Sequence, residues 1–477
     1  MTQARPPSES AGAAGVSGPP GTTAAVLRLV LPVLVEQVLA LSVGFTDKWL
    51  AGNLFPGAEP LAAVGLVAYG LGFLPVMFAV PAVAATALVA RHVGAGDLAG
   101  ARRTATHAFL IGGAVTVLAM ACAGVGGGFG GTLGLPADSA ALADRYLAIV
   151  LAGLPAMLVI HVGVAVLRGA GDMVAGLVAM SVVNLVNAGL SFALGAGAWG
   201  LPRLGWDGLA WGTLVGHMCG AVVVGSLLCR RRSGLRPAWA DWRPRREWLG
   251  RLLRVGLPAG VDAAANAACH LAFLGIVNRL GNVDAAAHSV AITIESLSFL
   301  PGSAFGVAAA TLAGQYLGAR DERRARRSVW LSAVVCGLLM SSVGVGFLAQ
   351  AEPLAAWFTG GVGRQPAVAA LTATLVRIVA FAQPPLALLM VCSGGLRGGG
   401  ATRPPLIVNF LGLTAIRLPL ALVLAWPAVT LPAGLGTIPG CGLGAVGAWY
   451  AMAADLTARG VAMLIIFSRL RWSRVRV

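Results

Sequence analysis

Charged residues are scarce in this chain, and their scarcity indicates its class. Asp, Glu, Lys and Arg make up 11% of the 477 residues, and hydrophobic residues make up 57%, whereas soluble domains carry roughly 25% charged residues. Lysine is almost missing, because Lys48 is the single lysine among 34 basic residues. The net charge of +16 does not indicate nucleic-acid binding, since the arginines lie in short polar breaks between apolar runs, where they act as topological signals. The composition therefore predicts a polytopic membrane protein.

Motifs for catalysis and metal binding are also lacking. The chain has neither a GxxxxGKS/T phosphate-binding loop nor an HExxH zinc motif, so we do not expect a nucleotide-driven pump or an intramembrane metalloenzyme. Seven cysteines are present, none in a CxxC pair and most within apolar runs. This pattern favours small buried side chains over disulfides or a metal site. We therefore expect a protein that is not an enzyme and that has no cofactor.

Twelve apolar runs follow an N-terminal tail. Residues 1–22 are rich in Pro, Ser, Ala and Gly without an apolar core, which is typical of a disordered tail and not of a signal peptide. A membrane-spanning helix needs roughly 20 mainly apolar residues, and each run is long enough. The expected spans are 24–52, 60–90, 101–127, 139–166, 173–197, 208–229, 252–277, 285–316, 326–349, 367–393, 404–428 and 442–467.

Arginine is concentrated in every second break between these runs. Clusters follow the second, eighth, tenth and twelfth spans, and the densest one follows the sixth span, at 230–251. The positive-inside rule places these breaks and both termini in the cytoplasm. We therefore expect a disordered cytoplasmic tail at 1–22, an N-terminal lobe at 23–230, a basic cytoplasmic linker at 231–251, a C-terminal lobe at 252–468 and a basic tail at 469–477, in the plasma (inner) membrane.

The two halves of the chain repeat one another. Four motifs recur in the same order with offsets of 224 to 229 residues: Leu27–Pro32 as Leu253–Pro258, Leu74-Pro75 as Leu300-Pro301, Val93–Asp97 as Leu317–Asp321, and Leu167–Gly171 as Leu396–Gly400. One such match would be weak, but four at nearly one offset indicate a duplication. Since an even number of spans separates equivalent points, the repeats are parallel, and transporters built in this way bind their substrate between the halves.

Asp47 lies deep in the first apolar run. An ionised carboxylate far from water costs several kcal/mol unless it is paired, protonated or facing a wet cavity, and burial favours the protonated form of a carboxyl group. Asp47 is therefore the leading candidate for a proton or cation site. The alternative is that Asp47, with Lys48 beside it, lies in the interfacial region and is simply solvated.

The repeated motifs resemble those of the multidrug and toxic compound extrusion (MATE) transporters over essentially the whole chain after the tail. The resemblance rests on the turns GAGD and GARD with the arginines that follow them, on the two LRG turns, and above all on the block Ala285–Gly318. It implies an all-α fold of two six-helix lobes forming a V, and substrate efflux coupled to inward flow of H+ or Na+. It also implies that Asp47 exchanges the coupling ion and that Pro32 lets the first helix bend, which agrees with the missing backbone donor of proline.

The chain departs from the family pattern at two places. Some members carry an Asp in helix five, four residues after an Asn. Here Asn184 matches that Asn, but the residue four positions later is alanine, with Asn187 next to it. Members of one branch carry a Glu in helix seven, where this chain offers Asp262, Asn266 and His270. We therefore favour protons over sodium ions.

Other polar side chains within the apolar runs have a functional and a structural interpretation. Glu295 and Asp262 are further candidates for coupling to a proton or cation, or for hydrogen bonds between helices. Arg417 and Asp455 are expected to form a structural ion pair, because mutual neutralisation lowers the cost of burial. Candidates for lining a substrate cavity, as alternatives to plain packing, are Asn184, Asn187, Asn266, His270, Tyr69 and Met77.

Three charged residues near the proposed cytoplasmic side are expected to be structural. Glu36, one turn after Pro32, is expected to make a hydrogen bond between helices. Arg168 and Arg397, in the two LRG turns, are expected to fix loop geometry or to cap helices.

The sequence thus predicts a secondary active antiporter that exports amphiphilic or cationic small molecules in exchange for H+, with Na+ as the alternative, by alternating access. Its expected partners are a small-molecule substrate and membrane lipid, without nucleic acid, and it is expected to be a monomer. Two rival functions remain open. One is a lipid-linked saccharide or lipid flippase of the same wider superfamily, and the other is a membrane sensor that does not transport.

Overall fold

The computed structural model of the protein describes residues 23–57, 59–125, 137–230, 234–236, 238–361, 363–430 and 437–470. The tail predicted at 1–22, most of the tail at 469–477 and part of the linker at 231–251 lie outside these residues. Within them, eleven helices are long and apolar enough to cross a membrane, and a bent pair at 137–169 makes a twelfth span. The prediction of an all-α, multi-pass membrane protein is confirmed.

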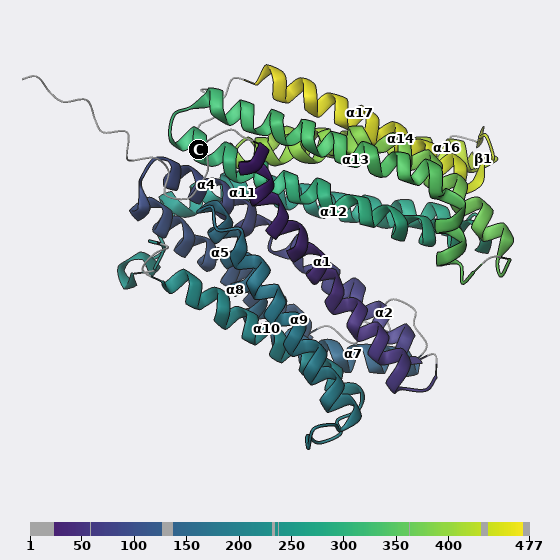
Figure 1. Ribbon diagram of the computed structural model, residues 1–477, viewed down its shortest axis with the longest axis horizontal. Coiled ribbons are helices and arrows are strands. Elements are labelled where there is room, and N and C mark those ends of the chain that lie inside the picture. The colour runs from purple at the N-terminus through teal and green to yellow at the C-terminus, as the bar shows by residue number, and fades with distance from the viewer. Residues whose placement is uncertain are drawn as a thin grey trace, which may run out of the picture.

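The helices of the first half form one bundle and those of the second half form another (Figure 1). The first bundle contains α1 (Thr23–Leu54), α2 (Glu59–Gly72), α3 (Leu74–Met77), α4 (Ala79–Gly94), α5 (Leu98–Val125), α7 (Ala137–Leu151), α8 (Leu154–Gly169), α9 (Val174–Ala196) and α10 (Trp206–Cys229). The second contains α11 (Arg246–Asn278), α12 (Asn282–Gly318), α13 (Glu322–Phe358), α14 (Pro366–Gly398), α15 (Arg403–Leu411), the π-helical segment η3 (Gly412–Arg417), α16 (Leu418–Ala425) and α17 (Gly444–Arg469).

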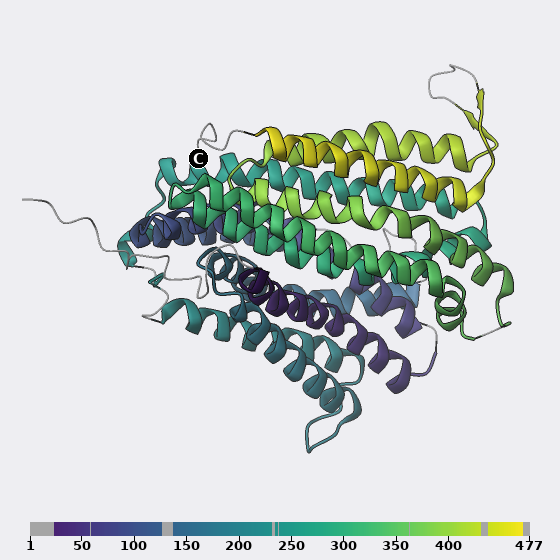
Figure 2. The same ribbon diagram turned by 45° about the horizontal axis from the view of Figure 1, so that its top comes forward.

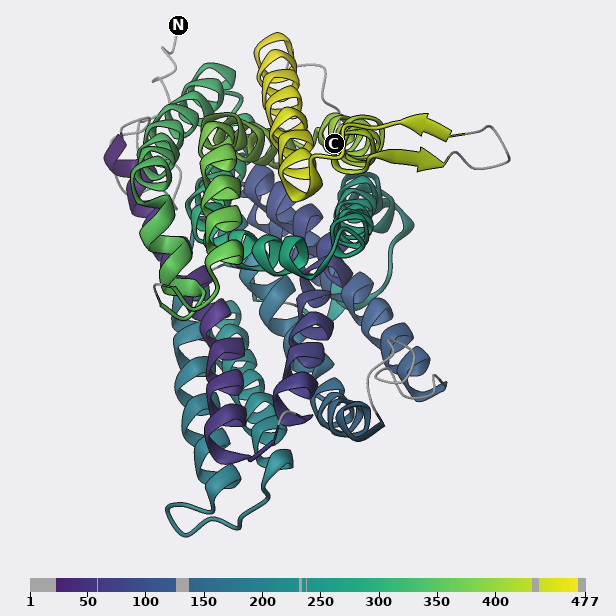
Figure 3. The same cartoon turned by 90° about the vertical axis from the view of Figure 1, so that its right-hand side faces the viewer.

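The two bundles meet at one end of the molecule and diverge toward the other (Figure 1), and Figure 3 views the two bundles from the end at which they diverge. At the meeting end, α4 packs against α11 and α12, and α1 packs against α12. We call this the junction end; it holds the turns at 95–97 and 319–321. The opposite, splayed end holds the start of α2 and a hairpin of β1 (Ala428–Thr430) and β2 (Thr437–Pro439), whose strands pair antiparallel with Val429 opposite Ile438. Figure 2 shows this hairpin projecting beyond the helices.

Several spans that the sequence predicts as continuous are broken. The fourth span bends by 60° between α7 and α8, where Gly153 precedes a helix that carries proline in its first turn. The second span is divided into α2, α3 and α4, and the eleventh contains the π-helical segment η3. The ninth span continues as α13 to Phe358, beyond its predicted end at 349, with a non-helical residue at Gln350. Helix α11 begins at Arg246, within the predicted linker, and the short 3-10 helix η2 (Trp239–Trp242) precedes it.

The first helix of each half is shared between the bundles. Val26, Leu29, Val30 and Val33, at the start of α1, are buried in the core of the second bundle, whereas the later part of α1 contributes to the core of the first. Helix α11 does the converse: its early residues Leu252 and Val255 belong to the core of the first bundle, and its end belongs to the second. The two halves therefore exchange the first turns of their first helices.

Helices α4 and α12 cross at the junction end with almost no space between their backbones. A Cβ atom on Gly94 would lie 1.9 Å from the backbone oxygen of Gln315, and one on Gly318 would lie 2.1 Å from that of Arg91. Gly318 is the counterpart of Gly94, and Gln315 is the counterpart of Arg91, at the same offset of 224 residues. The two contacts are therefore equivalent to one another when the halves are exchanged. Glycine allows such close approach of transmembrane helices, so this crossing lies on the pseudo-symmetry axis of the molecule.

Candidate functional site

Asp47 is buried inside the first bundle. Only 2% of the residue is exposed. The ion pairs of the first bundle that the structure describes involve other acidic residues, so Asp47 has no cationic partner there. The alternative that Asp47 is simply solvated is therefore wrong. Three hydrogen-bond donors meet the carboxylate instead.

These donors come from three helices. Tyr146 in α7 donates its hydroxyl to Oδ2 of Asp47 at 2.7 Å, and Thr213 in α10 donates to the same oxygen at 3.1 Å. Asn187 in α9 donates its amide to Oδ1 at 3.3 Å and to Thr213 at 2.9 Å. Ser191, one turn after Asn187, accepts from the same amide at 3.3 Å. All four side chains are completely buried.

This arrangement can respond to a proton on Asp47. When the carboxyl group is charged, all three neighbours can donate to it. When it is protonated, its own O–H becomes a donor, and one of the two hydroxyl groups must rotate to accept. The Tyr146 and Thr213 hydroxyls already lie 2.8 Å apart, so such a rotation needs little movement. Since the donors belong to α7, α9 and α10, loading a proton changes the hydrogen bonds that hold α1 to three other helices.

Asn184, which the resemblance matches to the family's helix-five Asn, lies one turn away from the Asp47 site. The amide of Asn184 donates to the backbone oxygens of Leu39 and Met180, each at 2.8 Å, so it joins α1 to α9 without contacting Asp47. Asn187 occupies the site, and the residue four positions after it is Ser191. The i, i+4 spacing of Asn187 and Ser191 is the signal that could have found this pair in the sequence.

The second bundle holds a different polar network. Asp455 in α17 accepts from Arg417 Nε at 2.9 Å, which is the ion pair that the sequence predicts, and from Arg459 at 2.6 and 2.8 Å. Arg459 also donates to Asn409 at 3.2 Å, and Asn409 donates to Asp262 at 3.0 Å. A continuous chain of hydrogen bonds therefore joins α11 to α15, η3 and α17.

The π-helical segment makes room for this network. A Cβ atom on Gly412, the first residue of η3, would lie 2.4 Å from the Arg459 side chain and 2.6 Å from Oδ1 of Asp455. A π-bulge inserts an extra residue into a helix and is frequent at functional sites. Here the bulge and its glycine place Arg417 on Asp455 and leave space for Arg459.

Glu295 in α12 lies near this network. Its carboxylate is half-buried and makes no hydrogen bond or ion pair with the described residues. The guanidinium of Arg417 is close enough to act on it electrostatically. Asp262 and Asp455 carry two negative charges against the three positive charges of Arg397, Arg417 and Arg459. An ionised Glu295 would bring the sum to zero.

Asp262 does not lie beside Asp47 but at the junction end, in an ion pair with Arg397 of α14. The first half contains the counterpart of this pair: Nη2 of Arg168 in α8 lies 2.6 Å from Oε2 of Glu36 in α1. In each half the carboxylate lies one turn after the helix proline, Pro32 or Pro258. The two LRG arginines therefore do more than shape their turns, because each one ties the first helix of its half to the fourth.

The remaining candidates lie apart from Asp47. His270 in α11 is exposed at the helix surface, where its Nδ1 contacts the backbone oxygen of Asn266 at 2.9 Å. Asn266 is half-buried, and Met77 packs at the edge of the first core. The side chain of Tyr69 lies outside the described part of the structure. Within the described residues, no group of three or more His, Cys, Asp or Glu side chains could hold a metal ion.

Comparison with known proteins gives a consistent result. A family model described as MatE matches residues 32–193 and 258–423, so that each match begins at the helix proline. A "Probable multidrug resistance protein NorM" of Thermotoga maritima is 27% identical and aligns over 94% of this chain and 93% of its own length. One of the same name from Burkholderia pseudomallei is 30% identical over 92% and 90%. A solved structure titled "Crystal structure of MATE in complex with MaL6" has a TM-score of 0.84 at 20% identity, covering 97% of this chain and 98% of its own.

Proposed function

The chain belongs to the MatE family, and from this premise we propose that it is an antiporter that exports amphiphilic or cationic small molecules in exchange for protons. The family consists of transporters rather than enzymes, and the curated relatives are named as multidrug resistance proteins. Multidrug efflux is therefore the activity of the protein. Its coupling ion and its mechanism are our proposal.

The observation that carries the proposal is the buried, unpaired carboxyl group of Asp47 among three donors. A charge held by hydrogen bonds alone can be removed by a proton without leaving a buried counter-charge behind. An arginine partner would oppose this step. Asp47 is thus a group that can cycle between its two protonation states inside the bundle.

Protons suit this site better than sodium ions. A sodium ion needs several oxygen lone pairs directed at it, whereas most of the lone pairs of Asp47 already accept from O–H and N–H donors of Tyr146, Thr213 and Asn187. A proton needs only one of these lone pairs and the rotation of one hydroxyl group.

The shared first helices supply the coupling between protonation and movement. Helix α1 carries Asp47 in the first bundle while its start is packed into the second, and Pro32 weakens the helix within that start. A change in the hydrogen bonds of Asp47 therefore acts on a helix that both bundles hold. We propose that the bundles alternate between exposing the substrate to the cytoplasm and to the outside, with the junction end cytoplasmic because the arginine-rich breaks lie there.

Flux into proteoliposomes tests the proposal. Full-length protein is reconstituted, a proton gradient or a sodium gradient is imposed separately, and movement of the cationic dye ethidium is followed. We expect the proton gradient alone to drive the dye, and Asp47→Asn to abolish this flux. Asp138→Asn, which removes an exposed carboxylate from α7, is the matched control and should transport normally. Normal flux in Asp47→Asn, or flux driven only by sodium, would reject the proposal.

A further inference from the structure

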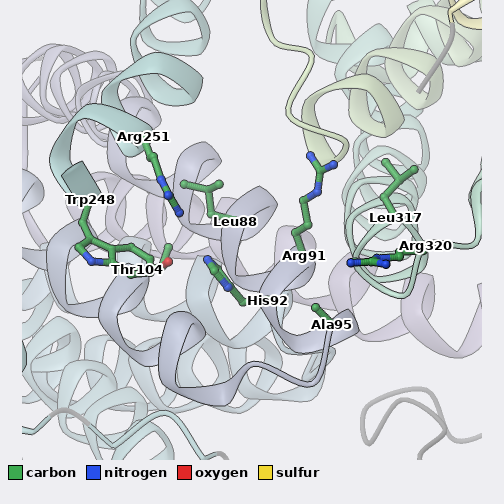
Figure 4. Close-up of a pocket in the computed structure, with 10 residues that line it drawn as sticks. Leu88, Arg91, His92, Ala95, Thr104, Trp248, Arg251, Leu317 and Arg320 are labelled. Carbon is green, nitrogen blue, oxygen red and sulfur yellow. The ribbon is translucent and has the colours of Figure 1, made fainter. Parts of the chain in front are cut away.

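A pocket of about 310 Å³ lies at the junction end, between the two halves of the protein. Its walls come from α4, the start of α5, the start of α11, the end of α12 and the turns after α4 and α12. Figure 4 shows Trp248, Arg251 and Thr104 on one side and Arg91, Leu317 and Arg320 on the other, with His92 between them. The lining residues are Leu88, Arg91, His92, Ala95, Thr104, Trp248, Arg251, Leu317, Gly318 and Arg320.

The pocket is strongly basic. Three arginines and one histidine line it, and none of the lining residues is acidic. Two acids lie at its edge: Asp97 contacts His92 at 2.9 Å, and Glu247 contacts Arg251 at 2.6 Å. The backbone N–H of Gly100, and then His92, hold the pKa of Asp97 below its usual value. Neither acid contacts Arg320, so this arginine keeps its positive charge at the pocket wall.

Arg320 occupies a backbone position that normally requires glycine. Its φ of +59° is left-handed, and among the described residues only one other non-glycine residue, Trp199, has a positive φ. Equivalent turns end α4, α8 and α14, and there the left-handed residue is Gly96, Gly171 or Gly400. A strained residue of this kind is kept where its side chain has a use. If Arg320 served only as a positive-inside signal, its charge could lie in the neighbouring helical turn without backbone strain.

The hydroxyl group of Thr104, which also lines the pocket, has no partner among the described residues. Thr104 is completely buried, and its hydroxyl group makes no hydrogen bond with any residue that the structure describes. A buried hydroxyl without a partner is costly. Beside it, the ring of Trp248 lies 5.4 Å from the guanidinium of Arg251 and 5.6 Å from the ring of His92. The aromatic ring thus packs against two of the basic side chains.

We propose that this pocket binds a phosphate group, with Arg320, Arg251 and Arg91 as its cationic contacts and Thr104 as a hydroxyl donor. Arginine pairs with phosphate through two parallel N–H bonds, and basic pockets between transmembrane helices on the cytoplasmic side suit anionic lipid headgroups. The phosphate belongs either to an anionic phospholipid of the adjoining leaflet or to a soluble ion. Because the walls come from both halves, the bound group holds α4 against α11 and α12.

Thermal stability of the full-length protein in detergent tests this site without any transport assay. The melting temperature is measured against increasing dioleoylphosphatidylglycerol, against dioleoylphosphatidylcholine, and against inorganic phosphate with chloride at equal ionic strength. The test variant is Arg320→Gly, which reproduces the glycine of the first repeat, removes the backbone strain and should fold at least as well as the wild type. The matched control is Arg323→Ala, which removes an exposed arginine from the next turn.

We expect phosphatidylglycerol or phosphate to raise the melting temperature of the wild type and of Arg323→Ala. Loss of one charge-assisted contact should weaken the apparent affinity of Arg320→Gly by about tenfold or more. Stabilisation by phosphatidylglycerol alone assigns the phosphate to a lipid, and stabilisation by inorganic phosphate as well assigns it to a soluble anion. The proposal is overturned if neither probe stabilises the wild type, if Arg320→Gly responds as the wild type does, or if Arg323→Ala loses as much affinity.

Discussion

Replacing Glu36 by glutamine should destabilise the protein and stop transport, although Asp47 is untouched. The change leaves the guanidinium of Arg168, with 20% of its side chain exposed, without its counter-charge. Breaking a buried ion pair by removing one partner costs about 3 to 5 kcal/mol. Since the Arg168 side chain is not fully buried, we expect the free energy of unfolding to fall by about 3 kcal/mol, at the lower end of that range.

A double-mutant cycle separates the pair from its surroundings. Arg168→Gln alone leaves the Glu36 carboxylate buried beside Gly176, where a Cβ atom would lie 2.3 Å from it, and should cost a similar amount. The double variant carries two neutral amides that can bond to one another, so we expect it to recover most of the loss. The cycle should therefore give a coupling energy of at least about 1.5 kcal/mol, within the range for residues in direct contact.

The assay uses the cysteines of the protein itself. Cys269, Cys336 and Cys392 are buried and become reactive to a thiol-specific fluorescent dye only when the helices separate on heating. The matching cycle in the second half, with Asp262→Asn and Arg397→Gln, is the internal comparison. If the Glu36 and Arg168 variants add independently, or if the double variant is the least stable of the set, the pair does not hold α1 and the reasoning fails.

Two further changes test the packing of the bundles. Gly94→Ala should prevent normal assembly, because its Cβ atom would lie 1.9 Å from a backbone oxygen of α12. The control Gly113→Ala, with nothing within 4 Å of its Cβ atom, should be neutral or stabilising by up to about 1 kcal/mol. The yield and the elution volume in detergent compare the two variants. Asp455→Asn should lower the melting temperature more than Arg417→Met does. The Asp455 change leaves two buried arginines without a carboxylate, whereas the Arg417 change leaves Asp455 paired with Arg459. Equal melting temperatures of the two variants would contradict this explanation.

Much of the fold follows from patterns that are local in the sequence. Apolar length predicts the spans, and the offset between Pro32 and Pro258 predicts two related bundles, because each is a property of neighbouring residues repeated along the chain. The exchange of the first turns of α1 and α11 is not predictable in this way. Val26 and Val43 are equally apolar, and only the packing of the whole molecule decides that the first joins one core and the second joins the other.

The candidate site was predictable to the same limited extent. Asp47 stands out as an acid within an apolar run, but Tyr146 and Thr213 are 99 and 166 residues away from it and carry no charge that would mark them. Glu36 was visible as a charged residue one turn after Pro32, and Arg168 as one near the end of α8. That they form a pair, and that Asp262 and Arg397 repeat it, depends on how the first and fourth helices of each half come together.

The shared helices also bear on how such a molecule can assemble. Neither half can complete its interior alone, because the opening turns it needs are supplied by the other. Two fragments produced separately, cut between residues 230 and 246, would have to associate before either became stable. A polypeptide of half this length could satisfy the same requirement by pairing with a second copy of itself, each lending its leading segment to the other, and the present chain is the arrangement that results when two such copies are joined end to end.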